Sequence, residues 1–211
     1  MITYKDLQAD LHIHTISSGH AFSTISEIIE AAQKKDLKTI AVTDHGPALR
    51  GGAHPYHFGN LRVLDANIDG IRVLKGTEAN IIDSEGNLDL PDDVMNTLDF
   101  IMVTFHLHCG YEDAGAEENT KALINAMERN RIHAIAHPGN QLFKLDYDLL
   151  AKTAKEMDIL IEFNNSSYSG GTSRYDARDL DLKMGLACKK YKTPVVVSSD
   201  AHIAFDVGRF K

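Results

Sequence analysis

The sequence lacks the usual features of secreted and membrane proteins. Its 211 residues include only two cysteines, Cys109 and Cys188, and the amino-terminal stretch MITYKDLQAD is charged from position 5, which leaves no secretory apolar region. No apolar run approaches the length that spans a bilayer. We therefore expect a cytoplasmic protein without a membrane partner.

Basic runs are also absent. The 30 aspartates and glutamates outnumber the 22 lysines and arginines, for a formal net charge of -8. Because a protein that follows a nucleic-acid backbone needs a basic patch, we expect no nucleic-acid partner. Internal repeats, low-complexity segments and linkers rich in proline or serine are missing too, so residues 1–211 are expected to form a single domain. Histidine, with 11 copies, is abundant, and function is best sought there.

Short runs rich in valine, isoleucine and leucine alternate with longer amphipathic stretches, a pattern typical of βα units. Strands are predicted at residues 9–13, 38–43, 71–77, 99–105, 132–136, 159–163 and 194–199. Helices are predicted at residues 23–36, 92–98, 117–130, 146–157 and 179–192, the first with Ser23 as its cap. Near-continuous apolar strands between helices indicate an α/β fold with a parallel sheet buried on both faces.

Two connections are longer than packing requires. Residues 45–60 follow the second predicted strand and residues 164–178 follow the sixth. In α/β barrels the loops after strand carboxyl ends build the active site, so both are candidate substrate loops. Residues 78–91, with Glu85-Gly86 between two extended runs, predict a surface hairpin.

Side chains that can ligate a metal fall at the carboxyl ends of six of the seven predicted strands. They are His12 and His14, His45, Glu78, His106, His137, and Asp200 with His202. Residues two apart on a strand point to the same face, so His12 and His14 can converge on one ion, as can Asp200 and His202. The sixth predicted strand ends instead in two amides, Asn164 and Asn165.

With His20, the set amounts to seven histidines, one glutamate and one aspartate. A zinc site uses about four ligands, and a catalytic one about three, so nine ligands predict two or three metals. Imidazole and carboxylate suit zinc, manganese and iron about equally, so the ligand types leave the element open. Zinc is our first expectation, with manganese and iron as alternatives.

The motifs DLHIHT, TDHG, GTEAN, AHPGN and SSDAH, in that order, resemble the PHP (polymerase and histidinol phosphatase) superfamily. GHAFST and NNSS resemble its YcdX-like phosphatase branch, and the resemblance spans nearly the whole chain. It implies a distorted (β/α)7 TIM-like barrel with three metals in a cleft at the strand carboxyl ends. The family continues beyond the FDVGRFK segment, so the expected barrel lacks the last carboxy-terminal helix. Whether the chain is a fragment, and whether it forms a homo-oligomer, stays open.

The resemblance also implies how the ligands group. It assigns His12, His14, Glu78 and Asp200 to one ion, Glu78, His106 and His137 to a second, and His20, His45 and His202 to a third. No ligand position of the family pattern is substituted, which favours an active enzyme.

Clustered divalent ions activate water and offset charge on phosphoryl oxygens, and no serine or cysteine lies in a recognisable nucleophile motif. We therefore predict a phosphatase that hydrolyses small phosphomonoesters by means of a metal-bound hydroxide at a trinuclear site. A phosphodiesterase or 3'-5' exonuclease is an alternative, because PHP domains attached to DNA polymerases use the same cluster. A metal-binding module without turnover is the non-enzymatic alternative.

The other polar residues near these motifs can have either a functional or an ordinary structural role. His57, in the loop at 45–60, is either an exposed residue or a contact for phosphate or the leaving group, as is His54 to a lesser degree. Asn164 is expected to hydrogen-bond the ligands or their water. The remaining candidates have ordinary roles: His108 in the cleft wall, His133 as a structural residue, Cys109 as an apolar filler and Arg50 as an exposed loop residue.

Overall fold

Seven parallel strands form the sheet in the computed structural model, which describes residue 3, residues 6–169 and residues 174–210. Their order is β1-β2-β4-β5-β6-β7-β8. The strands are β1 (Ala9–Ile13), β2 (Thr39–Val42), β4 (Ile71–Asn80), β5 (Phe100–Thr104), β6 (Ala134–Ile135), β7 (Leu160–Asn164) and β8 (Val195–Ser198). The seven predicted strands are thus confirmed to within a few residues. A short strand that the apolar pattern does not predict, β3 (Asn67–Ile68), pairs antiparallel with β4.

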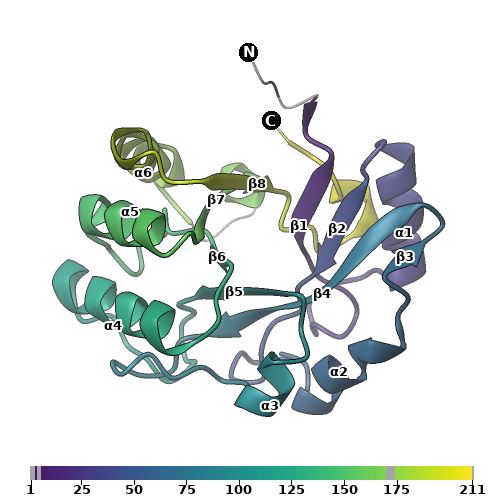
Figure 1. The fold of residues 1–211 in the computed structure, drawn as a ribbon, viewed down its shortest axis with the longest axis horizontal. Coiled ribbons are helices and arrows are strands. Elements are labelled where there is room, and N and C mark those ends of the chain that lie inside the picture. Colours follow the sequence, from purple (N-terminus) through teal and green to yellow (C-terminus); the bar gives the residue numbers. More distant parts are fainter. Residues whose placement is uncertain (1–2, 4–5, 170–173, 211) are drawn as a thin grey trace.

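Helices connect the strands and lie outside the sheet. They are α1 (Ile25–Lys34), α2 (Pro55–Asn60), α3 (Asp92–Met95), α4 (Ala116–Arg129), α5 (Tyr147–Glu156) and α6 (Ala177–Tyr191), with 3-10 turns η2 (Leu61–Val63), η3 (Asn165–Tyr168) and η4 (Ala204–Asp206). Figure 1 shows α4, α5 and α6 side by side outside β5 to β7, and α1 beside β1, β2 and β4. This arrangement confirms the predicted parallel α/β architecture.

Local chemistry at α1 and α2 differs from the prediction. Ser23 is not the cap of α1: Thr24 is, because its backbone N–H donates to Glu27 Oε2 at 2.7 Å and the Glu27 N–H donates back to Thr24 Oγ1 at 3.4 Å. Ser23 Oγ instead accepts from the Ala204 N–H at 2.9 Å, which ties α1 to the segment after β8. Helix α2 lies inside the stretch predicted as a long loop, where Pro55 occupies its first turn.

The predicted hairpin is present, but it begins later than expected. Glu78 to Asn80 continue β4, and the chain then turns back so that Ile81 pairs antiparallel with Leu88. The Ile82 N–H donates to Asn87 O at 3.0 Å across this turn. Glu78 therefore sits inside a strand rather than in a loop.

The barrel closes between β1 and β8 only near their carboxyl ends. Ile13 pairs with Ala201, and the His14 N–H donates to Ala201 O at 2.9 Å. Toward the start of β1, the buried carboxylate of Asp10 links the two edges of the sheet, since it accepts the N–H groups of Ser199 at 3.0 Å and Gly208 at 2.8 Å. A side chain thus replaces ladder hydrogen bonds, and the barrel is distorted, as predicted.

The interior changes from apolar to polar toward the carboxyl ends of the strands. An apolar layer consists of Ala41, Phe100, Met102, Ala134 and Ala136, with Leu160 packed against it. On β7 alternate side chains share a face, so Glu162 and Asn164 follow Leu160 along the inner face, and both are buried. The apolar layer supports a polar layer above it.

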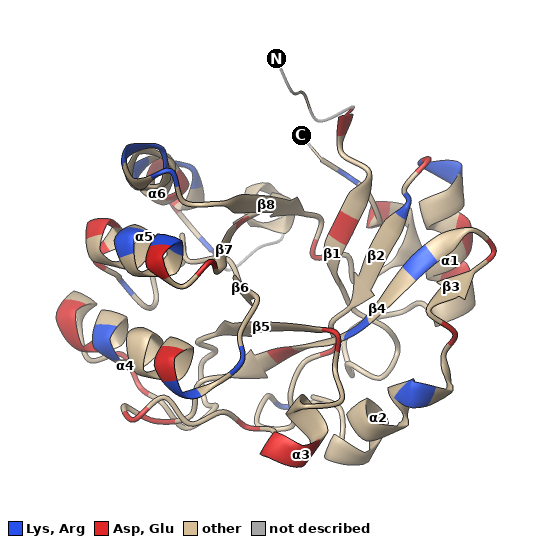
Figure 2. Ribbon diagram, viewed as in Figure 1, with Lys and Arg blue, Asp and Glu red and all other residues tan. Residues whose placement is uncertain are grey.

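The outer surface carries mixed charge. In Figure 2, Lys and Arg lie among Asp and Glu along α4, α5 and α6. Within the described ranges, no helix combines the length and apolar character required to cross a bilayer.

Candidate metal centre

The nine predicted ligands lie together at the carboxyl end of the barrel, with Glu78 at their centre. The carboxylate of Glu78, which has no exposed surface, lies close to ring nitrogens from five histidines. Those distances are 3.4 Å to His12, 3.6 Å to His14, 2.7 Å to His45, 3.7 Å to His106 and 2.7 Å to His137. The carboxylate of Glu78 therefore lies close to rings from the ends of four other strands, β1, β2, β5 and β6.

The remaining predicted ligands extend this cluster. Asp200 Oδ1 lies 3.2 Å from His14 Nε2 and 3.5 Å from His12 Nε2. His202 Nε2 lies 3.0 Å from His20 Nε2 at the exposed rim. The residues after β8 thus connect the buried centre to His20, which is held on the loop after β1 by the Gly19 N–H bond to Gly51 O at 2.7 Å.

Candidate ligand atoms within 4.8 Å of one another form four groups of three among the described residues. The groups are His12, His14 and Asp200; His12, Glu78 and His137; His45, Glu78 and His106; and His14, His45 and His202. Glu78 belongs to the second and third groups, so it lies between two neighbouring sets of candidate ligands. His45 lies both with Glu78 and with His202, and His20 belongs to none of the groups, so the assignment of ligands to single ions stays a prediction.

Unsatisfied atoms show that the cluster suits cations. Within the described part of the chain, Glu78 Oε2, His14 Nδ1 and both ring nitrogens of His45 are buried without a hydrogen-bond partner. The close approach of His45 Nδ1 to Glu78 Oε2 therefore lacks hydrogen-bond geometry. His12 Nε2 and His14 Nε2 lie 3.0 Å apart, so two ring nitrogens also converge on one point. Buried polar atoms normally have partners, and divalent cations would supply them here.

The protonation of the cluster also suits metal binding. Burial lowers the pKa of His106 to about 3 and holds the pKa of His14 well below its usual value, so these rings are neutral. Burial raises the pKa of Glu78, but neighbouring His12 and His45 outweigh it and hold this pKa well below its ordinary value. Neutral imidazole and ionised carboxylate are the forms that bind metals.

His12 behaves differently from these rings. Burial lowers its pKa, but the carboxylates of Glu162, Asp200 and Glu78 more than compensate, so the pKa of His12 lies well above its usual value. Three buried carboxylates thus attract a proton to His12 in the absence of another cation. A divalent ion would take the place of that proton.

Neighbouring side chains orient the candidate ligands. His12 Nδ1 donates to Glu162 Oε1 at 2.8 Å, and His106 Nδ1 donates to Asn80 Oδ1 at 2.8 Å. The half-buried carboxylate of Asp89 holds Asn80 in turn, since it accepts the Asn80 N–H at 2.9 Å. Such partners fix the tautomer that leaves Nε2 free to ligate a metal.

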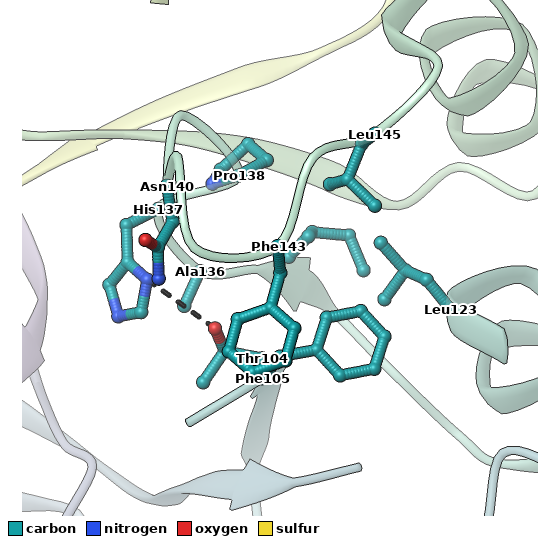
Figure 3. Close-up of a pocket in the computed structure, with 10 residues that line it drawn as sticks. Thr104, Phe105, Leu123, Ala136, His137, Pro138, Asn140, Phe143 and Leu145 are labelled. Carbon is teal, nitrogen blue, oxygen red and sulfur yellow. Dashed lines mark hydrogen bonds between the residues drawn. The ribbon is translucent and has the colours of Figure 1, made fainter. Parts of the chain in front are cut away.

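His137 rests against an apolar wall. Its Nδ1 lies 3.3 Å from Thr104 Oγ1, as Figure 3 shows, and Phe105 and Phe143 line the cavity beside it. That cavity measures about 10 Å³, which is room for about one water molecule. The His137 ring therefore has little space to turn away from Glu78.

Two candidate ligands have strained backbones. The φ angle is 29° at His137 and 55° at Asp200, in the region that residues with a Cβ rarely adopt. The His137 N–H is held by Glu162 Oε2 at 2.7 Å. Strain of this kind persists where surrounding contacts enforce it and is common at functional sites.

The long loop after β2 brings His57 to the edge of the cluster. His57 Nε2 lies 3.0 Å from Oδ2 of Asp44, the residue before His45, and the His57 side chain is 22% exposed. Asp44 has no exposed surface and also accepts hydrogen bonds from Thr15 and Ser18. His57 is thus anchored on a buried carboxylate with one edge open to solvent.

Asn164 contacts carboxylates of the cluster. Its Nδ2 lies 3.2 Å from both Glu162 Oε2 and Asp200 Oδ2. Arg174, which sequence reasoning missed, donates from Nη2 to Asp200 Oδ2 at 2.8 Å, and its side chain is 13% exposed. Residues 170–173 of the predicted substrate loop lie outside the described residues.

The other polar candidates belong to none of the ligand groups found among the described residues. His54 is exposed and caps α2, and His108 is exposed in a turn. His133 Nδ1 accepts the Ile101 N–H at 3.0 Å, which agrees with a structural role. Cys109 is buried, and burial raises the pKa of its thiol to about 11, so it is not a ready thiolate ligand.

Comparisons with known proteins agree with this geometry. The model of the PHP domain family matches residues 10–183. A protein of Caldanaerobacter subterraneus subsp. tengcongensis named "probable phosphatase" is 46% identical over 204 residues, which cover 97% of this chain and 80% of that protein. A "probable phosphatase" of Acetivibrio thermocellus is 44% identical over 201 residues, or 95% of this chain and 82% of that protein.

A solved structure shares the fold. Histidinol phosphate phosphatase of Lactococcus lactis subsp. lactis, in complex with zinc, L-histidinol and phosphate, superposes with a TM-score of 0.67 at 14% identity. The superposition covers 93% of this chain and 87% of that chain. It confirms the predicted TIM-like barrel.

Proposed function

The chain belongs to the PHP domain family, and on that premise we propose that it is a metal-dependent phosphatase acting on small phosphomonoesters. The observation that carries the proposal is the convergence of five imidazoles on the buried carboxylate of Glu78, with unsatisfied ligand atoms among them. The names of the relatives support phosphatase activity.

We assign the ligands as the family resemblance implies. His12, His14, Glu78 and Asp200 hold one ion, Glu78, His106 and His137 a second, and His20, His45 and His202 a third. Zinc is the favoured metal, since these ligand types suit it and the Lactococcus lactis structure was solved with zinc. When bound, such ions act as Lewis acids toward water and phosphoryl oxygens.

Arg174 binds the anionic substrate, and the buried Asn164 orients the carboxylates beside it. The guanidinium of Arg174 donates a hydrogen bond to Asp200. Its other N–H groups are suited to donate to phosphoryl oxygens, which a guanidinium can bind in bidentate geometry. Asn164 keeps Asp200 and Glu162 apart at a fixed distance by donating to both. These two residues orient the substrate phosphate and the carboxylate beside it.

His57 handles the proton of the leaving group. To act as the acid, the ring carries a proton on both nitrogens: Nε2–H is held by Asp44, and Nδ1–H passes to the leaving oxygen, which leaves the neutral imidazole on Asp44. Asp44 suits this task because it stays ionised: burial raises its pKa, but the hydrogen bonds from His57 and Ser18 bring that pKa below the usual value. His57 is thus a general acid held by a carboxylate.

The test compares phosphoester classes. Protein loaded with zinc is incubated with p-nitrophenyl phosphate, glycerol phosphate, bis(p-nitrophenyl) phosphate and labelled single-stranded DNA. We expect phosphate release from both monoesters. Cleavage of the diester or of DNA without monoester turnover would contradict the proposal, and full metal occupancy without turnover of any substrate would favour a metal-binding module.

A further inference from the structure

Glu162 is a buried carboxylate at the centre of β7 that the ligand assignment does not use. It has no exposed surface and lies on the inner face of the barrel. Its Oε1 accepts from His12 Nδ1 at 2.8 Å, and its Oε2 accepts the backbone N–H of His137 at 2.7 Å. Oε2 also lies 3.2 Å from Asn164 Nδ2.

We propose that Glu162 is a positioning residue that holds His12 and His137 in ligating geometry and so couples two metal positions. The proposal rests on the metal ligation assigned above to those two histidines. It concerns metal binding alone and can hold even where the chain hydrolyses no phosphoester.

The contact with His12 crosses the barrel interior from β7 to β1. By accepting Nδ1–H, Glu162 fixes the tautomer whose Nε2 faces the cluster, 3.4 Å from Glu78 Oε2 and 3.5 Å from Asp200 Oδ1. A carboxylate partner also makes the ring a stronger ligand than an amide partner does. His106, whose ring donates to the amide of Asn80, provides the contrast within the same cluster.

The contact with His137 acts on the backbone. With a φ of 29°, His137 occupies a conformation that must be enforced from outside. The 2.7 Å hydrogen bond to Glu162 Oε2 supplies that restraint and aims the His137 ring at Glu78 Oε1, also 2.7 Å away. Thr104 restrains only the ring, through a longer 3.3 Å contact.

Two acceptors on one side chain are needed for both contacts. A glutamine has a single carbonyl oxygen, so in Glu162→Gln either His12 Nδ1–H or the His137 N–H faces an amide donor. The variant keeps the size of the side chain and loses one charge and one acceptor. It therefore separates positioning from packing.

The experiment measures zinc binding without substrate. Metal-free wild type, Glu162→Gln, Thr104→Val and the control Glu156→Gln, whose side chain is 63% exposed, are titrated with zinc against a competing chelator. We expect Glu162→Gln, which keeps one of the two acceptors, to weaken at least one zinc-binding step by about 10- to 100-fold, Thr104→Val to weaken only one step, and the control to match wild type. Unchanged zinc affinity at every step in folded Glu162→Gln would overturn the proposal.

A second measurement uses the wild-type protein, in case Glu162→Gln does not fold. Nitrogen-15 NMR of the histidine rings in the zinc-loaded protein reports which ring nitrogen carries a proton. We expect His12 to carry it on Nδ1, in a strongly hydrogen-bonded and downfield resonance. A zinc-loaded His12 with its proton on Nε2, or with an Nδ1–H that exchanges freely with water, would refute the positioning role.

Discussion

Replacement of His57 by alanine should slow the enzyme by an amount that depends on the leaving group. General acid catalysis contributes about 10²- to 10⁴-fold to the rate. The alkoxide that leaves glycerol phosphate needs a proton, so kcat on this substrate should fall by that factor. p-Nitrophenolate leaves without help, and the loss on p-nitrophenyl phosphate should be much smaller. Zinc content should be unchanged, since the His57 ring contacts Asp44 rather than a proposed ligand.

The structure also sets the size of the effect for Asp44. The 3.0 Å contact between His57 and Asp44 is charge-assisted, and such bonds contribute about 1.5 to 3 kcal/mol. At 1.36 kcal/mol for each tenfold change, Asp44→Asn should lower kcat on glycerol phosphate by about 10- to 150-fold. The assay is steady-state phosphate release on both substrates, with zinc content measured for each variant. An equal loss on the two substrates in His57→Ala would refute the proton-donor role.

Three further variants or conditions test the cluster. Glu78→Ala should lose zinc and activity together, because Glu78 contacts five imidazoles, and normal turnover in this variant would disprove the assigned ligands. Arg174→Gln should raise KM and the inhibition constant of inorganic phosphate by about 10- to 150-fold, which corresponds to a charge-assisted bond of about 1.5 to 3 kcal/mol, and it should retain its zinc. An unchanged KM would exclude Arg174 from phosphate binding. In the metal-free protein the pKa values of Glu78 and Asp200 in the folded state are lowered. The stabilisation of the fold by these two carboxylates is therefore present above their ordinary pKa values of 4.5 and 3.8, and it is lost as the pH falls through the lowered pKa values of the folded state. The pKa of His12 is raised, so its stabilisation is complete below its ordinary value of 6.5 and is lost as the pH rises through the folded value. Thermal melting against pH should therefore show the metal-free protein weakening at both ends, with zinc removing the alkaline loss, and a flat profile would contradict these shifts.

The strand pattern and the candidate ligands could be predicted because both depend on local order in the chain. Each parallel strand ends at the same edge of the sheet, so histidines at those ends come together whatever the details of the connections. The α2 helix could not be predicted from local sequence order. Gly59 and Pro55 favour a loop, and only the cap at His54 and the packing of Phe58 indicate a helix.

The supporting residues were harder to predict than the ligands. Glu162 lies inside the run ILIEF, which periodicity identifies as a buried strand, and a charged residue two positions before Asn164 was the available signal. Asn80 and Asp89 come together only when the hairpin folds back, as shown by the Asn80 N–H bond to Asp89 Oδ1. Arg174 reaches Asp200 from a different loop, and nothing in its local sequence indicates this contact.

The most direct test of a metal-dependent phosphatase is a zinc titration of the metal-free protein that follows phosphate release from a phosphomonoester. The account predicts no release without metal, activity that rises with added zinc, and saturation at about two to three equivalents per chain, in line with nine ligands at about three to four for each ion. Turnover in the metal-free protein, or no release at full zinc occupancy across the phosphomonoester panel, would contradict it.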